Sequence, residues 1–134
     1  MVMAITEIKL SFRSSTMPTL DLKTNVSLPD VNKYMLELSK TAAETLGKPE
    51  KYINITVSSQ PMTFQGTLDP AFQCTVISLG NLDPDSCARY SKTLFEHFER
   101  TLGVKDDRGY ITFVDPGRSN LGYKGTTFQF LQSS

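Results

Sequence analysis

The sequence is poor in the residues from which metal centres, disulfide frameworks and membrane spans are built. Its 134 residues include two cysteines, one histidine and no tryptophan. These are too few for a closed Cys/His zinc site or for a framework of disulfides. No apolar run approaches the roughly 20 residues of a spanning helix. The apolar start, residues 1–5, runs directly into Glu7 and Lys9, so we expect no secretion signal.

The sequence also lacks an excess of charge. Lys and Arg total 14, Asp and Glu total 14, and the formal net charge is zero. A nucleic-acid-binding surface needs a basic excess or a basic stripe, and neither is present. We therefore expect neither a nucleic-acid nor a membrane partner. With 39% hydrophobic and 21% charged residues, the chain has the composition of one folded soluble domain.

An internal repeat is visible, with the two copies offset by about 56 residues. Thr45-Leu46-Gly47 falls opposite Thr101-Leu102-Gly103, and Asp30 falls opposite Ser86. Each copy begins with residues alternating between apolar and polar, which predicts a strand, around Leu20 and Leu22 or around Phe72, Cys74 and Val76. Two half-domains of similar plan are expected.

A helix is predicted in each copy after the strand. Pro29-Asp30 and Asp83-Pro84-Asp85 are typical of helix starts, and Gly47 and Gly103 are typical of helix ends. Apolar residues recur at helical spacing between them. A second strand follows in each copy, over residues 52–58 and 110–114.

The pattern predicts an α/β (α+β) fold with a duplicated β-α-β unit, in which both helices lie on one face of a four-stranded sheet. The other face is polar and is expected to meet water or to line a wet cavity between subunits. We interpret residues 115–125 as a loop and residues 126–131 as strand-like. Residues 1–17 stand apart from the repeat, either as an unstructured extension or with a short edge strand. The residues predicted for the polar face are Thr19, Asp21, Asn54, Thr56, Gln73 and Thr75.

Few side chains suggest catalysis. His97 lies within a helical pattern and is interpreted as structural, and Cys74 and Cys87, which form no Cys-x-x-Cys, are interpreted as small buried hydrophobic residues. Asp106-Asp107 indicates a solvated turn, and the glycines of residues 117–125 lack the pattern of a phosphate loop.

Two positions allow both a structural and a chemical interpretation. Pro18 follows Met17 at the start of a strand, which is typical of an edge strand. If residues 1–17 are removed, Pro18 instead has a free secondary amine, which an apolar pocket would keep neutral and basic. Lys48 follows a predicted helix, where it either offsets the helix dipole or serves as a functional group in a loop between helix and strand.

Several segments together resemble the macrophage migration inhibitory factor and D-dopachrome tautomerase family. They are Met17-Pro18-Thr19-Leu20, Thr24-Asn25-Val26, residues 46–53, Met62-Thr63-Phe64, Asp69-Pro70, Ser78-Leu79-Gly80 and residues 121–128. No single segment is diagnostic, whereas their order and spacing are specific. The resemblance runs from Met17 to about Phe130 and agrees with the duplicated β-α-β plan.

The resemblance implies a homotrimer with a keto–enol tautomerase pocket at each subunit boundary and no cofactor. It implies residues 18–134 as the tautomerase domain and residues 1–17 as an extension. Pro18 would be the catalytic base, and Lys48 would hold the substrate carboxylate. Leu79 would donate its backbone N–H to the substrate, and Tyr110 would come from the neighbouring subunit. The pocket wall would be formed by Tyr52, Leu121, Tyr123 and Phe128.

Three departures from the family pattern bear on this activity. While residues 1–17 remain attached, the nitrogen of Pro18 is an amide and cannot act as a base. Thr112, which the resemblance places among the substrate-binding residues, stands where the family often has Asn, so one hydrogen bond to the substrate is expected to differ. The family's Cys-x-x-Cys is Ala71-Phe72-Gln73-Cys74 here, so we expect no thiol-reductase activity.

Two functions are therefore expected on the basis of the resemblance. The first is a phenylpyruvate- or dopachrome-type tautomerase that uses Pro18. The second is a leaderless cytokine-like protein, cytoplasmic and secreted without a signal peptide, that binds a cell-surface receptor. A ferredoxin-like nucleic-acid module shares the β-α-β repeat, but no aromatic-basic strand is present to support it.

Overall fold

The computed structural model describes residues 17–131 of the chain. The prediction of a short edge strand within residues 1–16 lies outside the described part. Within it, no helix is long and apolar enough to cross a membrane.

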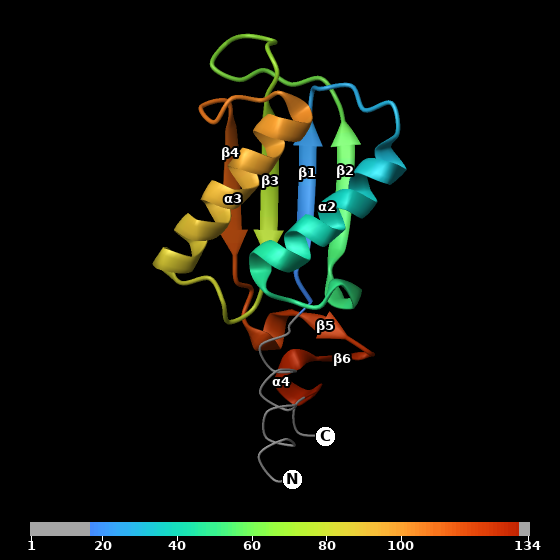
Figure 1. Ribbon diagram of the computed structural model, residues 1–134. Coiled ribbons are helices and arrows are strands. Elements are labelled where there is room, and N and C mark those ends of the chain that lie inside the picture. Colours follow the sequence, from blue (N-terminus) through green and yellow to red (C-terminus); the bar gives the residue numbers. More distant parts are fainter. Residues whose placement is uncertain (1–16, 132–134) are drawn as a thin grey trace.

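The core of the fold is a four-stranded sheet in the order β2-β1-β3-β4 (Figure 1). The strands are β1 (Thr19–Thr24), β2 (Asn54–Ser59), β3 (Phe72–Ile77) and β4 (Gly109–Val114). β1 pairs with β2 and β3 pairs with β4 in parallel, while β1 and β3 are antiparallel. The duplicated β-α-β prediction is confirmed, and the two units meet at the central antiparallel pair.

Helices α2 (Val31–Leu46) and α3 (Pro84–Leu102) cover one face of this sheet (Figure 1). The Asp30 carboxylate accepts the Lys33 N–H at 3.1 Å, and the Asp83 carboxylate accepts the Ser86 N–H at 2.8 Å. These bonds satisfy amides that the first helical turn leaves free. Both helices end at glycines with a left-handed backbone, Gly47 and Gly103.

The repeat is not a single uniform offset. Helix α2 has 16 residues and α3 has 19. The caps therefore pair Asp30 with Asp83, and the expected pairing of Asp30 with Ser86 is wrong. Gly47 and Gly103 correspond as predicted, since the extra residues lie within the helix.

The hydrophobic core lies between the sheet and the two helices. Leu20 and Leu22 from β1 meet Leu38 of α2 and Phe98 of α3, and all four are almost completely buried. Burying a side chain of this size stabilises the fold by about 1.5–3 kcal/mol. Strand β4 approaches the core so closely that a Cβ on Gly109 would lie 2.4 Å from the ring of Phe72, which only glycine allows.

The opposite face of the sheet is polar, as predicted. Asn54, Thr56 and Gln73 are exposed there, and Asp21 accepts a hydrogen bond from the Thr56 hydroxyl at 2.7 Å. The alternation of buried and partly exposed residues along β1 produces this division.

The chain after β4 differs from the prediction. It forms the short helix η2 (Arg118–Asn120), the hairpin β5 (Gly122–Tyr123) and β6 (Thr126–Thr127), and the helical turn α4 (Phe128–Leu131). Lys124 and Gly125 have positive φ values of 56° and 78°, which suit a two-residue hairpin turn. The loop prediction for residues 115–125 and the strand prediction for residues 126–131 are therefore only partly right.

The end of β6 coincides with hydrogen bonds made by the backbone of Phe128. Strand pairing stops at Gly122 and Thr127. Beyond it, the Phe128 N–H donates to the Leu121 carbonyl at 3.0 Å, and the Phe128 carbonyl accepts from Arg118 at 2.8 Å. The helical turn α4 begins at Phe128, in place of the expected strand.

Candidate active site

Pro18 lies immediately before β1 and is almost completely buried. Its carbonyl accepts the Asn54 N–H at 2.9 Å. The edge-strand interpretation of this proline is wrong, because β1 is paired on both sides, with β2 and with β3. In this chain Pro18 is joined to Met17, so its nitrogen is an amide while that bond is intact.

Lys48 lies one residue beyond the end of α2 and is only 8% exposed. Its backbone N–H donates to the Ala43 carbonyl at 3.0 Å, which fixes its place at the helix end. Burial lowers the pKa of its ammonium, and no carboxylate of the described residues counteracts that shift. A buried ammonium of this kind gains free energy when an anion is placed against it.

Residues 78–80 follow β3 at the end of the sheet where Pro18 lies, since Thr19 pairs with Ile77. Leu79 is 2% exposed. The segment is tied to the end of β4: the Ser78 N–H donates to the Val114 carbonyl at 3.0 Å, and the Gly80 N–H donates to the carboxylate of Asp115, directly after β4, at 3.0 Å. Leu79 is thus held rigidly near the strand that Pro18 begins.

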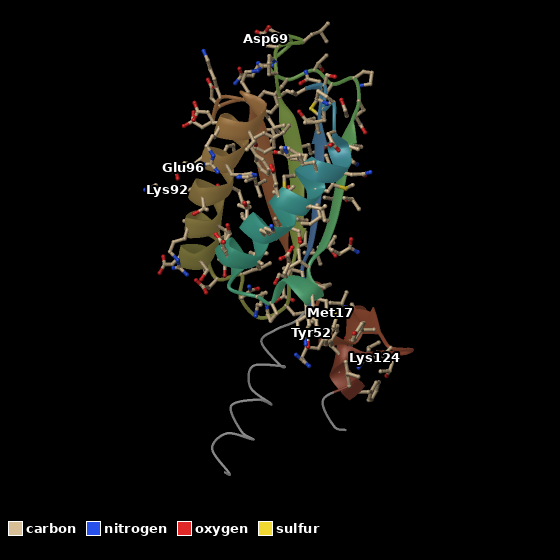
Figure 2. All side chains as sticks on the ribbon, turned by 45° about the vertical axis from the view of Figure 1, so that its right-hand side comes forward. Met17, Tyr52, Asp69, Lys92, Glu96 and Lys124 are labelled. Carbon is tan, nitrogen blue, oxygen red and sulfur yellow. The ribbon has the colours of Figure 1, made fainter. Side chains whose placement is uncertain are left out.

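The predicted wall residues come from two segments. Tyr52 lies in helix η1 (Glu50–Tyr52), two residues before β2 and not at its start as predicted. Leu121, Tyr123 and Phe128 come from the C-terminal hairpin, where the rings of Tyr123 and Phe128 stack with centroids 5.9 Å apart. Figure 2 shows Tyr52 beside Met17 below the sheet, with Lys124 on the neighbouring hairpin.

Each aromatic ring of this wall has a positively charged side chain within 6 Å of its centroid, and the sequence analysis did not predict these contacts. Lys51 lies 5.0 Å from the Tyr52 centroid, Lys124 lies 5.5 Å from that of Tyr123, and Arg118 lies 6.0 Å from that of Phe128. For Lys51 and Lys124 the available signal was their direct sequence adjacency to a predicted wall residue. The positive charges favour an anionic ligand near this wall.

Tyr110 and Thr112 do not join these residues within one chain. Tyr110 pairs with Gln73, which itself pairs with Lys23 near the far end of β1 from Pro18. Its side chain is 71% exposed. Thr112 pairs with Thr75 and is also exposed. A site containing Pro18 and Tyr110 therefore needs two copies of the chain.

The remaining titratable candidates lie elsewhere. His97 is 5% exposed and receives a hydrogen bond from Arg100 at its Nδ1, at 3.1 Å, in agreement with a structural role. Cys74 is buried, and burial raises the pKa of its thiol to about 12. Cys87 is only half-buried, so its interpretation as a buried residue is wrong. Within residues 17–131 no group of three potential ligands is arranged to hold a metal ion.

Comparison with known proteins identifies the family. The sequence model described as macrophage migration inhibitory factor (MIF) matches residues 17–129. The chain belongs to this family. It is similar to the macrophage migration inhibitory factor homologue of Trichuris trichiura, with 37% identity over 114 residues that cover 84% of this chain and 100% of the relative. The macrophage migration inhibitory factor of Rattus norvegicus is 36% identical, with 84% and 99% covered.

Solved structures agree with the fold. The crystal structure of a macrophage migration inhibitory factor homologue from Prochlorococcus marinus matches with a TM-score of 0.76 and 37% identity, covering 82% of this chain and 98% of that one. The structure of the macrophage migration inhibitory factor from Trichinella spiralis matches with a TM-score of 0.76 and 31% identity, covering 82% and 99%. The predicted family and fold class are confirmed.

Proposed function

We propose that this member of the macrophage migration inhibitory factor family is a keto–enol tautomerase of aryl pyruvates, with Pro18 as its base once residues 1–17 are removed. The observation that carries the proposal is that Pro18 and Lys48, two residue types that usually lie at the surface, are both buried at one end of the sheet. Pro18 is buried at the start of β1, and Lys48 is buried with its pKa lowered. Membership of the family supports this type of activity.

The proposed reaction uses each residue for one task. Lys48 binds the substrate carboxylate, and the aromatic wall of Tyr52, Tyr123 and Phe128 holds the ring. The free amine of Pro18 takes a proton from the carbon next to the carbonyl while the carbonyl oxygen gains one, which converts the keto form to the enol. Apolar neighbours disfavour the charged amine and keep it available as a base.

The backbone N–H of Leu79 and the side chain of Tyr110 complete the proposed site. Leu79 donates its backbone N–H to the substrate. Tyr110 of a neighbouring copy closes the base of the pocket, because within one chain it lies at the other end of the sheet from Pro18. Thr112 lies on the same strand as Tyr110, and its shorter side chain gives a weaker contact than the asparagine common in the family. We accordingly propose a homotrimer.

The proposal is tested by comparing two forms of the protein. One is the 134-residue chain, and the other is expressed from Met17 so that an aminopeptidase leaves Pro18 first. The shorter form covers the full core and corresponds to nearly the whole length of the relatives. We expect it to isomerise phenylpyruvate at least about 100-fold faster, because general-base catalysis contributes roughly 10²–10⁴-fold.

The matched control is Pro18→Gly in the shorter form, which keeps an N-terminal amine but loses the secondary amine and its rigid ring. Mass spectrometry verifies the first residue of each sample. Equal turnover by the long and short forms would refute the free-amine mechanism.

Receptor binding is a second candidate function, supported by the similarity to the macrophage migration inhibitory factor of Rattus norvegicus. A receptor-binding role of this kind would depend on the outer surface and not on the amine of Pro18. The Pro18→Gly variant separates the two functions, since it removes turnover and leaves a surface-mediated signal intact.

A further inference from the structure

Arg108 is a buried arginine whose side chain is hydrogen-bonded to the loop of residues 65–70. It lies immediately before β4 and is 9% exposed. Its backbone carbonyl accepts the Phe72 N–H at 3.2 Å, so its main chain is fixed to β3. Its guanidinium donates to the carbonyls of Pro70 at 2.9 Å and Asp69 at 3.0 Å. Burial of a guanidinium is costly without such partners, and here they all come from residues 65–70.

The same guanidinium fixes an aromatic ring. It lies 5.5 Å from the centroid of Phe64 and donates to the Gln65 side chain at 3.4 Å. Phe64 and Thr67 close a tight turn through two mutual backbone hydrogen bonds of 3.1 Å. Gln65 donates in return to the Asp107 carbonyl at 3.0 Å. The turn at residues 64–67 and the segment before β4 therefore each donate a hydrogen bond to the other.

Phe64 in turn contacts Tyr110. Their ring centroids are 5.1 Å apart with an interplanar angle of 52°, a favourable tilted arrangement. Tyr110 is otherwise 71% exposed, so little else limits its rotamers within one chain. The three residues form a continuous series of contacts from a buried cation, through one ring, to an exposed ring.

We propose that Arg108 is a positioning residue for Tyr110, acting through Phe64. The inference rests on the proposed function, in which Tyr110 reaches the pocket of a neighbouring copy. By holding Phe64 in place, Arg108 limits the orientations of the tyrosine before substrate arrives, which reduces the entropy lost on binding. Loss of Arg108 is thus expected to raise the KM for an aryl pyruvate more than it lowers kcat.

The kinetic test is a double-mutant cycle in the form that begins at Pro18. Arg108→Ala is expected to raise the KM for phenylpyruvate roughly threefold to tenfold, the scale of one aromatic pair. Arg108→Lys is expected to recover only part of this loss, because it lacks the planar fork. In a Tyr110→Ala background, Arg108→Ala is expected to leave KM unchanged. An equal rise of KM in both backgrounds would overturn the proposal.

The control is Arg89→Ala, which removes an exposed arginine of α3 that bonds only within its own helix turn. It is expected to leave KM unchanged. Thermal unfolding tests for general damage. If Arg108 has a merely structural role, Arg108→Ala lowers Tm by the same amount with and without Tyr110. An altered KM in Arg89→Ala matching that of Arg108→Ala would also count against a specific role.

A second measurement does not depend on turnover. Tyrosines are replaced biosynthetically by 3-fluorotyrosine, and the Tyr110 fluorine resonance is assigned with Tyr110→Phe. We expect this resonance to shift and to change in width in Arg108→Ala and in Phe64→Leu, but not in Arg89→Ala. A resonance unchanged in both variants would refute the positioning role, whereas absent turnover in the unmutated short form would refute only the proposed function.

Discussion

The two halves of the molecule end their helices in the same way and then diverge. Gly47 and Gly103 both adopt left-handed backbone conformations, and the next residue in each half is buried. In the second half this residue is Val104, which is 0% exposed and belongs to the core. In the first half it is Lys48, which is 8% exposed.

The comparison separates what stability needs from what a site needs. The valine gains free energy by burying apolar surface, while the lysine loses hydration for its ammonium and its pKa is lowered. Two equivalent backbone positions therefore carry opposite energetic consequences. The costly residue occurs in the half that also contains Pro18, which agrees with a role for Lys48 in binding an anion.

The largest expected effect comes from placing the first half's residue in the second. Val104→Lys buries an ammonium in the apolar core. Burial can lower the pKa of a lysine by several units, which corresponds to an equivalent loss of folding free energy at neutral pH. We expect the free energy of unfolding in urea at pH 7 to fall by about 4 kcal/mol or more. Lys105→Ala, at the exposed neighbouring position, is the control and should change it little. If Val104→Lys left the free energy of unfolding unchanged, position 104 would not belong to a closed apolar core.

The reciprocal change should affect binding more than folding. Lys48→Met removes a desolvated cation, so the free energy of unfolding should stay the same or rise. In the form beginning at Pro18, the KM for phenylpyruvate should rise by about 10- to 100-fold, the scale of a charged hydrogen bond. Lys40→Met, on the exposed surface of α2, serves as the control for steady-state kinetics. If Lys48→Met instead destabilised the protein and left KM alone, the lysine would be structural.

The smallest effect concerns His97, whose counterpart in the first half at the helix-end offset is Thr41. Burial and, less strongly, Arg100 lower the pKa of His97, while Glu37 partly opposes this. The unfolded chain then binds more protons than the folded one, so this group's stabilisation is complete above an unfolded pKa of about 6.5 and is lost as pH falls below it. We expect His97→Gln to make the stability decline less steeply as pH falls below about 6.5. Urea titrations at several pH values measure this, and identical pH slopes for the two proteins would contradict it.

Much of the fold could be predicted because its signals are local. The alternation around Leu20 and Leu22 and the caps at Asp30 and Gly47 depend on neighbours in the chain, and they fixed the strands and helices correctly. The extra length of α3 was missed because matching the helix ends alone does not locate an insertion. The turn at Phe128 was missed because it depends on Arg118, which bonds from outside the local pattern.

The site was less accessible to sequence reasoning than the fold. Pro18 and Lys48 were singled out because each allows a chemical role beside its ordinary structural one, as a free secondary amine and as a cation in a loop. The role of the remaining residues came from the family resemblance, since Leu79, Tyr123 and Phe128 are ordinary apolar residues. The contacts of Arg108 with residues 65–70 left no sequence signal, because two separated segments make them.

The hairpin and helical turn at the C-terminal end of the described chain are held together largely within one segment, which bears on their local stability. Within this one segment Arg118 donates to the Phe128 carbonyl, the Phe128 N–H donates to the Leu121 carbonyl, and the ring of Phe128 stacks on that of Tyr123. Interactions confined to one segment can open at a lower free energy than the paired strands of the core. The stability of this C-terminal unit can therefore change separately from that of the β1–β3 pair.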